Sequence, residues 1–128
     1  FESMQVIRYG VGGHYVPHVD YLAGSGDEIG VGGDRQRSVI LYLNDDFDGG
    51  QTTFPKIGYV VHPEKGRAMV FDNLDPDRNP QPLSKHSGLV VLRGEKWIVN
   101  IIMREERYGQ PSNRAQRRKR ASRVKRSS

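Results

Sequence analysis

The chain has 128 residues, of which 35% are hydrophobic and 27% are charged, and this size and composition predict one folded domain with a modest apolar core. It contains no cysteine, which excludes disulfides, a thiolate metal site and a cysteine nucleophile, so a bound metal must be held by histidine and carboxylate groups. The net charge of +5 is unevenly distributed, because residues 104–128 carry ten Lys/Arg and two Glu, a net of +8, whereas residues 1–103 carry a net of −3. We therefore expect a folded body at residues 1–105 and a basic tail at residues 106–128.

Membrane insertion and secretion are not expected from this sequence. No run of eighteen or more apolar residues is present, which predicts that no helix spans a membrane and that the protein has no membrane partner. The first residues lack the charged and then apolar pattern of a secretion signal, and together with the absence of cysteine this favours a cytoplasmic location.

The body is predicted to be rich in β-structure, because short apolar runs alternate with Gly, Pro, Asn and Asp turn signals. In chain order, strands are expected at Met4–Tyr9, His14–Tyr21, Ser38–Asn44, Gln51–Phe54, Tyr59–His62, Ala68–Asp72, Gly88–Leu92 and Trp97–Met103. No segment of the body keeps a helical period. Many short strands without helices predict a sandwich or a barrel.

Two loops interrupt this pattern. The Gly-rich segment Ala23–Asp34 is either a surface connection or a mobile lid over an active site. The segment Leu74–Ser84 contains three prolines and leads directly toward His86.

A metal site is suggested by His18 and Asp20, because residues two apart on a strand point to the same face. An imidazole and a carboxylate at one point form two thirds of the set of two histidines and one carboxylate that binds iron(II) on one side and leaves the opposite positions open. His86 is the best candidate for the third ligand, since it lies just before a predicted strand. His14 is interpreted as a rim residue and His62 as structural or exposed.

Lys96 opens an apolar strand that runs to Met103. A lysine entering such a strand is costly unless its charge is paired, and a bound dicarboxylate would provide the partner. The alternative is a lysine at a turn whose ammonium group reaches water.

The tail contains two basic runs, Gln116–Arg120 and Arg123–Arg126, and few large apolar side chains. It is therefore predicted to be disordered or extended, because it cannot bury enough surface to fold alone. Contact with nucleic acid or with an acidic partner is the functional alternative.

Four motifs in this order resemble the 2-oxoglutarate/Fe(II)-dependent dioxygenase superfamily, and within it the prolyl 4-hydroxylase-like branch. They are Tyr9–Asp20 with its His-x-Asp, the stretch from Arg35 to Tyr42-Leu43 as in the Arg…Tyr-Leu strand, Gly49–Pro55, and the segment from His86 to Gly94-Glu95-Lys96-Trp97. The resemblance covers about Met4 to Glu105.

The resemblance implies an all-β core folded as a double-stranded β-helix, or jelly roll. It implies iron bound by His18, Asp20 and His86, with 2-oxoglutarate and O2 as co-substrates and ascorbate as a reductant. Lys96 would bind the remote carboxylate of 2-oxoglutarate, assisted by Tyr9 and Thr52. Two further residues, Arg35 and Tyr15, match positions that line the peptide-binding groove, and Ala23–Asp34 matches a lid.

The sequence also departs from the family pattern. Val90 stands where the branch usually has Pro, Ile102 where it often has an aromatic residue, and Arg104 where it often has His. The helices and the strand that precede the Tyr9 strand in the family are expected to be missing, which would leave the sheet without that support.

Three functions remain open from the sequence. The first is hydroxylation of prolyl residues in a Pro-containing peptide or protein. The second is the same iron chemistry on another protein residue or on nucleic acid. The third is a non-catalytic jelly-roll binding module that works through a tail that binds nucleic acid.

Overall fold

The computed structural model describes residues 1–22 and 33–105. Its strands are β1 (Gln5–Tyr9), β2 (Tyr15–His18), β3 (Arg35–Tyr42), β4 (Asp48–Gly49), β5 (Thr52–Phe54), β6 (Tyr59–Val61), β7 (Ala68–Asp72), β8 (His86–Gly88), β9 (Val91–Arg93) and β10 (Lys96–Arg104). Within these ranges the only helical element is the 3-10 helix η1 (Pro82–Ser84), and no helix is long and apolar enough to cross a lipid bilayer. Most of the expected lid at 23–34 and the basic tail at 106–128 lie outside the described residues, so both interpretations stay predictions.

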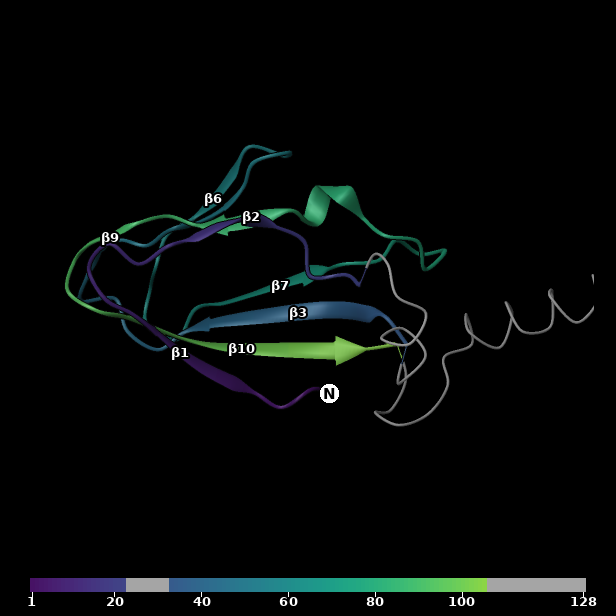
Figure 1. Cartoon of the computed structure of the whole chain (residues 1–128), viewed down its shortest axis with the longest axis horizontal. Coiled ribbons are helices and arrows are strands. Elements are labelled where there is room, and N and C mark those ends of the chain that lie inside the picture. The colour runs from purple at the N-terminus through teal and green to yellow at the C-terminus, as the bar shows by residue number, and fades with distance from the viewer. Residues whose placement is uncertain (23–32, 106–128) are drawn as a thin grey trace, which may run out of the picture.

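The strands form two facing layers (Figure 1). The major sheet has the order β1-β10-β3-β7, the minor sheet has the order β2-β8-β5-β6, and β4 pairs with β9 in a small third sheet. All of these pairings are antiparallel. Two layers of antiparallel strands with crossing connections confirm the predicted jelly roll.

Strand β10 shows why this sequence forms a two-layered fold. Its residues alternate, so that Ile98 and Ile102 are buried while Trp97 is exposed. The register with β3 sets Ile98 opposite Tyr42 and Ile102 opposite Ser38. The buried side chains of β10 and β3 therefore lie side by side and point into the space between the two sheets.

The apolar core lies between the layers and fills only part of the space between them. Its buried members are Ile40, Tyr42, Phe47, Phe54, Val61, Met69 and Ile98. Burial of each such side chain contributes roughly 1.5–3 kcal/mol to folding. Polar residues that are equally buried, Asp20, Ser38, Asn73, His86 and Lys96 among them, mark the remainder of this space as a candidate site.

The observed strands differ from the expected ones at several places, including the short strand β4, which was not expected, and three of the differences bear on the site. Strand β3 begins at Arg35 rather than Ser38, because its polar first residues pair across the sheet, as Arg37 does with Asp72 through an ion pair of 2.7 Å. The expected strand Gly88–Leu92 is divided between β8 and β9, because the chain changes partners there. The backbone N–H of Leu89 bonds to Gln51, and that of Val91 bonds to Gly13.

The third difference concerns the first metal motif. Strand β2 ends at His18, so Asp20 follows the strand instead of lying on it. The argument that placed both side chains on one face of a strand is therefore wrong in its detail. The backbone N–H of Leu22 bonds to the carboxylate of Asp34 at 2.7 Å, which fixes the path of the chain just after Asp20.

Candidate metal centre

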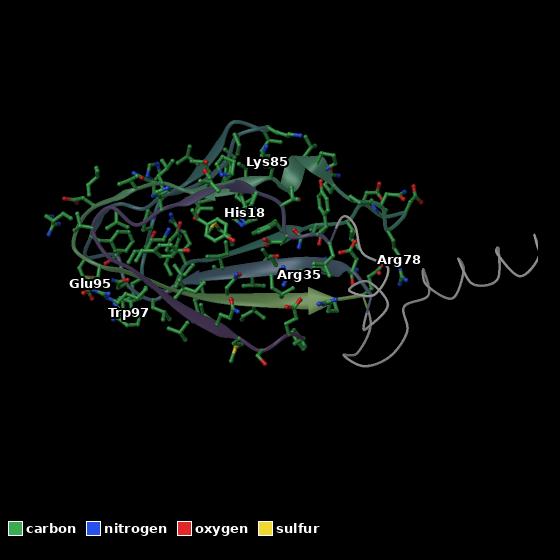
Figure 2. All side chains as sticks on the ribbon, in the orientation of Figure 1. His18, Arg35, Arg78, Lys85, Glu95 and Trp97 are labelled. Atoms are coloured by element: carbon green, nitrogen blue, oxygen red, sulfur yellow. The ribbon has the colours of Figure 1, made fainter. Side chains whose placement is uncertain are left out.

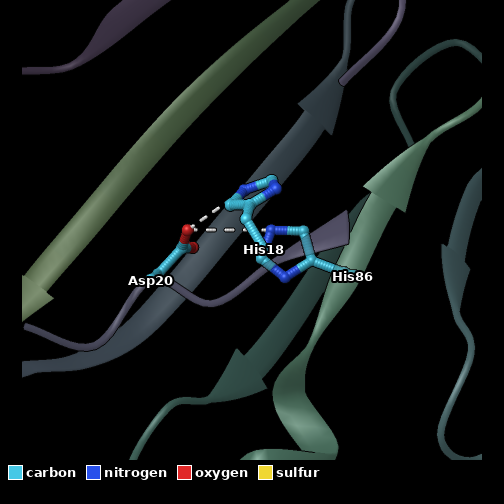
Figure 3. A group of neighbouring side chains, drawn as sticks. All are labelled: His18, Asp20 and His86. Atoms are coloured by element: carbon cyan, nitrogen blue, oxygen red, sulfur yellow. Dashed lines mark ion pairs between the residues drawn. The ribbon is translucent and has the colours of Figure 1, made fainter. Parts of the chain in front are cut away.

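Three side chains from two segments of the chain meet between the sheets (Figure 3). His18 ends β2 and His86 begins β8, and the two residues are direct partners in the register of the minor sheet. Asp20 lies two residues beyond His18. Its Oδ1 atom is 3.4 Å from His18 Nε2 and 3.7 Å from His86 Nε2, and the three ligand atoms all lie within 4.8 Å of one another.

Each histidine ring is oriented by a backbone carbonyl. Nδ1 of His18 lies 2.8 Å from the oxygen of Val16, and Nδ1 of His86 lies 2.8 Å from the oxygen of Ser84. A carbonyl oxygen can only accept, so each Nδ1 carries a proton, and the unprotonated form of each ring has its lone pair on Nε2. Burial lowers the pKa of His86 below its ordinary value, which keeps this ring neutral at neutral pH.

Asp20 remains ionised in spite of its burial. Burial by itself raises the pKa of this carboxyl group, but the hydrogen bonds from protonated His18 and from the Ser38 hydroxyl outweigh it and hold the pKa below its ordinary value. Ser38 Oγ donates to Asp20 Oδ2 at 2.6 Å. The second carboxylate oxygen, Oδ1, is the one that faces the two rings.

The donor set fits a divalent metal ion. With both rings unprotonated, the two imidazole Nε2 atoms and the carboxylate oxygen are all electron-pair donors, and at these separations they repel one another unless a cation lies among them. Two histidines and one carboxylate on one side of an ion are the ligand set of non-haem iron(II) oxygenases. Aromatic rings help to hold the histidines, since the rings of Tyr15 and His18 lie 3.9 Å apart and those of Phe71 and His86 lie 4.7 Å apart.

The ligands open into a cavity of about 260 Å³. It contains every residue that the sequence assigned to the site: Tyr9, Tyr15, His18, Asp20, Arg35, Thr52, His86 and Lys96. Figure 2 shows His18 between the two layers, while Glu95 and Trp97 lie at the end where β10 begins. The histidines that the sequence left out, His14 and His62, are absent from both the cavity lining and the cluster within the described residues.

Lys96 lies in this cavity with 4% of its surface exposed. Its Nζ atom is 5.1 Å from the centre of the Tyr9 ring and 5.8 Å from that of Tyr42. No ion pair in the described part of the chain includes this ammonium group, and burial lowers its pKa to about 8. A buried cation with aromatic rings but no anion beside it in the described residues has the charge and the desolvation to pair with a negatively charged ligand.

The Gly49-Gly50 pair allows two close approaches of the backbone, one of them to Lys96. Gly50 has a φ of +68°, and a Cβ atom there would lie 3.0 Å from Lys96 Cδ and 2.8 Å from the Phe47 ring. A Cβ at Gly49 would lie only 2.2 Å from the backbone oxygen of Val90. Gly50 thus allows the backbone to approach Lys96 closely, and Gly49 allows it to approach the backbone at Val90, which accounts for both glycines of the motif.

Hydroxyl groups complete the end of the cavity near the lysine. Tyr42 and Thr52 share a hydrogen bond of 2.7 Å between their hydroxyl oxygens. Burial raises the pKa of Tyr9 and of Tyr42, so both phenols stay protonated and able to donate. The site therefore offers one cation and several neutral donors together.

The other end of the cavity carries an arginine cluster. Arg35 donates to both carboxylate oxygens of Glu2, at 2.8 and 3.0 Å, and Arg104 donates to Glu2 at 2.9 Å. The guanidinium group of Arg35 is thus held in a fixed plane at the cavity. Tyr15 lies at the cavity with 47% of its surface exposed.

Sequence reasoning missed four residues that support the site: Glu2, Ser38, Tyr42 and Asn73. Ser38 had a signal, since a serine within an apolar strand is unusual and indicates a specific hydrogen bond. Tyr42 was recognised as part of a motif but received no role. Glu2 and Asn73 had no sequence signal, because their partners are 33 and 35 residues away.

Comparison with known proteins agrees with this geometry. A model of the 2OG-Fe(II) oxygenase superfamily matches residues 4–104. Prolyl 4-hydroxylase 2 of Arabidopsis thaliana is 37% identical over 119 residues, which covers 75% of this chain and 39% of the relative. Prolyl 4-hydroxylase subunit alpha-1 of Gallus gallus is 38% identical over 110 residues, which covers 81% of this chain and 21% of the relative.

A solved structure shares the fold. The 2OG complex of the viral collagen prolyl hydroxylase from Paramecium Bursaria Chlorella virus-1 superposes with a TM-score of 0.72 and 32% identity, covering 80% of this chain and 58% of that chain. The chain spans less than half the length of the two curated relatives. Since the family model matches most of the chain, and the metal-site motifs lie within the match, this chain belongs to the 2OG-Fe(II) oxygenase superfamily and is similar, within it, to the prolyl 4-hydroxylases.

Proposed function

We propose that this protein is an Fe(II)- and 2-oxoglutarate-dependent hydroxylase that acts on prolyl residues of a peptide or protein. One observation carries the proposal: His18, Asp20 and His86 converge in a cavity that also holds the buried cation of Lys96. A binding module without catalysis would have no use for a three-donor cluster and a costly buried lysine in the same cavity.

Each group has a defined part in this proposal. The Nε2 atoms of His18 and His86 and the Oδ1 atom of Asp20 would hold Fe(II). Lys96 would bind the remote carboxylate of 2-oxoglutarate through a charge-assisted hydrogen bond, with Tyr9 and Thr52 as neutral donors at the same end of the cavity.

When bound, Fe(II), 2-oxoglutarate and O2 supply the oxidation that yields succinate and CO2 and converts a substrate C–H group to C–OH. The protein orients the reactants and limits access of water, and it needs no acid or base side chain for the C–H step. The fixed Nδ1 protons of His18 and His86 suit this role, since these rings act as ligands rather than as proton carriers. Ascorbate is the proposed reductant that keeps the metal ferrous.

Proline is the proposed target because the relatives carry the name prolyl 4-hydroxylase, and because Arg35 and Tyr15, which match the peptide-binding groove of the family, line the same cavity as the three ligands. Two departures from the family pattern lie near this groove. Ile102 lines the cavity, and Arg104 joins the cluster around Glu2. These two residues favour a second candidate, the same iron chemistry on another amino-acid residue.

Mass spectrometry of Pro-rich peptides distinguishes these functions. The full chain is incubated with Fe(II), 2-oxoglutarate, ascorbate and O2, and succinate is measured in parallel. A gain of one oxygen on proline supports the proposal. The same gain on another residue would contradict proline as the target and support the second candidate. Absence of both succinate and modified peptide would contradict enzymatic function.

The role of Arg35 in peptide binding can be tested separately. Arg35→Gln is expected to raise KM for the peptide by about tenfold, since loss of a hydrogen bond from a charged group costs about 1.5–3 kcal/mol, and to leave the 2-oxoglutarate requirement nearly unchanged. Arg37→Gln is the matched control, because Arg37 lies on the same strand but pairs with Asp72 at the surface. Equal effects of the two substitutions on KM would remove Arg35 from the groove.

A further inference from the structure

The carboxylate of Asp20 is the end of a buried chain of hydrogen bonds. Ser38 Oγ donates to Asp20 Oδ2 at 2.6 Å, and Asn73 Nδ2 donates to Ser38 Oγ at 2.9 Å. Ser38 and Asn73 are both fully buried, with no exposed surface. Ser38 lies on β3 and Asn73 directly follows β7. These hydrogen bonds therefore link two neighbouring strands of the major sheet to the three candidate metal ligands.

The direction of each hydrogen bond follows from the number of protons. An ionised carboxylate has none, so Ser38 must donate to Asp20. A hydroxyl group has only one proton, and therefore Ser38 must accept from its other partner. Asn73 can satisfy this only by turning its NH2 group toward Ser38, and the backbone of Asn73 is itself fixed by bonds to Gln36 and Gln81.

This orientation of the amide leaves the side-chain carbonyl oxygen of Asn73 without a hydrogen bond in the described part of the chain. Asn73 Oδ1 is buried and has no hydrogen-bond partner among the described residues. An unpaired buried carbonyl is destabilising, and an apolar side chain of similar volume would avoid it. A polar residue at this position is therefore poorly explained by packing alone and better explained by what its NH2 group does to Ser38.

As a consequence, the two carboxylate oxygens of Asp20 have different surroundings. Oδ2 accepts the hydrogen bond of Ser38, while Oδ1 is the oxygen that lies 3.4 Å from His18 Nε2 and 3.7 Å from His86 Nε2. A carboxylate fixed in this way can offer one oxygen to a metal. If it were free to rotate, it could offer both oxygens and occupy one of the positions that a co-substrate needs.

We infer that Asn73 and Ser38 are positioning residues that hold Asp20 as a ligand through a single oxygen. This inference rests on the proposed metal site. The NH2 group of Asn73 donates to Ser38 and so directs the single hydroxyl proton of Ser38 toward Asp20. That hydrogen bond fixes the orientation of the Asp20 carboxylate.

The test uses the full chain without iron and Co(II) as the probe, because cobalt reports both affinity and coordination number through its visible absorption. Ser38→Ala is expected to weaken Co(II) binding by roughly 10–100-fold, the usual effect of removing a partner of a metal ligand. Asn73→Leu removes the donor together with the unpaired oxygen, and it is expected to weaken Co(II) binding without lowering the thermal midpoint of the metal-free protein. In both variants the visible absorption bands of Co(II) should change to those of a higher coordination number. Ser38→Thr keeps the hydroxyl group and should retain the wild-type spectrum.

The matched control is Thr53→Val, which removes a hydroxyl pair of 2.7 Å with Ser87 and touches neither Asp20 nor its partners. Folded Ser38→Ala and Asn73→Leu proteins that bind Co(II) within twofold of wild type with unchanged spectra would overturn the inference. If Ser38→Ala does not fold, the Asn73→Leu result decides alone. A wild-type chain that binds no Co(II) would overturn the proposed metal site and this inference together, whereas normal wild-type binding with unaffected variants would overturn the inference only.

Discussion

Replacement of His86 by alanine is expected to abolish both metal binding and turnover. The ring supplies one of three donors, and it is held by the Ser84 carbonyl and packed against Phe71, so no other described side chain can take its position. Affinity for Co(II) should fall by more than the roughly 10–100-fold that follows loss of an outer hydrogen-bond partner. Titration with Co(II) and measurement of succinate release test this expectation.

The control for this substitution is His14→Ala. His14 is exposed and immediately precedes β2, and its Nδ1 atom is 3.2 Å from the carbonyl of Gly12. It should retain both metal binding and turnover. Persistence of metal binding in a folded His86→Ala protein would show that the cluster is not the metal site.

Replacement of Lys96 by methionine is expected to have opposite effects on function and on stability. The 2-oxoglutarate requirement should rise tenfold or more, since a charged hydrogen bond is worth about 1.5–3 kcal/mol. The metal-free protein should become more stable at pH 7, because burial lowers the pKa of Lys96 from 10.5 to about 8 and this shift corresponds to a cost on the order of 3 kcal/mol. Loss of the contacts with Tyr9 and Tyr42 will offset part of that gain.

The same shift predicts how stability depends on pH. Between about pH 8 and pH 10.5 the unfolded chain binds a proton at Lys96 that the folded protein has released, so this lysine contributes an unfolding free energy that rises with pH across that range. The Lys96→Met protein should lack this contribution. Chemical denaturation of both proteins from pH 7 to pH 10 measures the difference, and Lys56→Met, which alters an exposed lysine on the β5–β6 hairpin, is the control.

Binding of 2-oxoglutarate should follow the opposite trend. The ligand needs the charged form of Lys96, so the 2-oxoglutarate requirement should increase as the pH rises above about 8. A requirement that is unchanged by Lys96→Met and constant across this range would mean that the ammonium group reaches water and takes no part in binding.

Several elements of the fold could be predicted from local patterns. The segments around Gln5–Tyr9, Ala68–Asp72 and Lys96–Arg104 were identified as strands because apolar and turn residues alternate clearly there. The start of β3 was missed, because Arg35 and Arg37 have the composition of a loop, and their pairing with distant strands cannot be read from neighbouring residues. The end of β2 was predicted too late, because the bond from Leu22 to Asp34 that fixes the chain just after Asp20 joins residues distant in the sequence.

The sequence by itself determined which chemical groups are available. The lack of cysteine limited the metal ligands to histidine and carboxylate, and the motifs around His18, Asp20, His86 and Lys96 identified the residues. Such information is local, because residue type and spacing follow directly from the chain.

Only the tertiary structure decided how these groups act together. It set Asp20 beyond the end of β2, placed Lys96 against two tyrosine rings without an anion, and brought Ser38 and Asn73 behind the carboxylate. The physical reason is that each of these arrangements depends on strand register and burial, which arise from contacts between segments far apart in the sequence and have no counterpart in local composition.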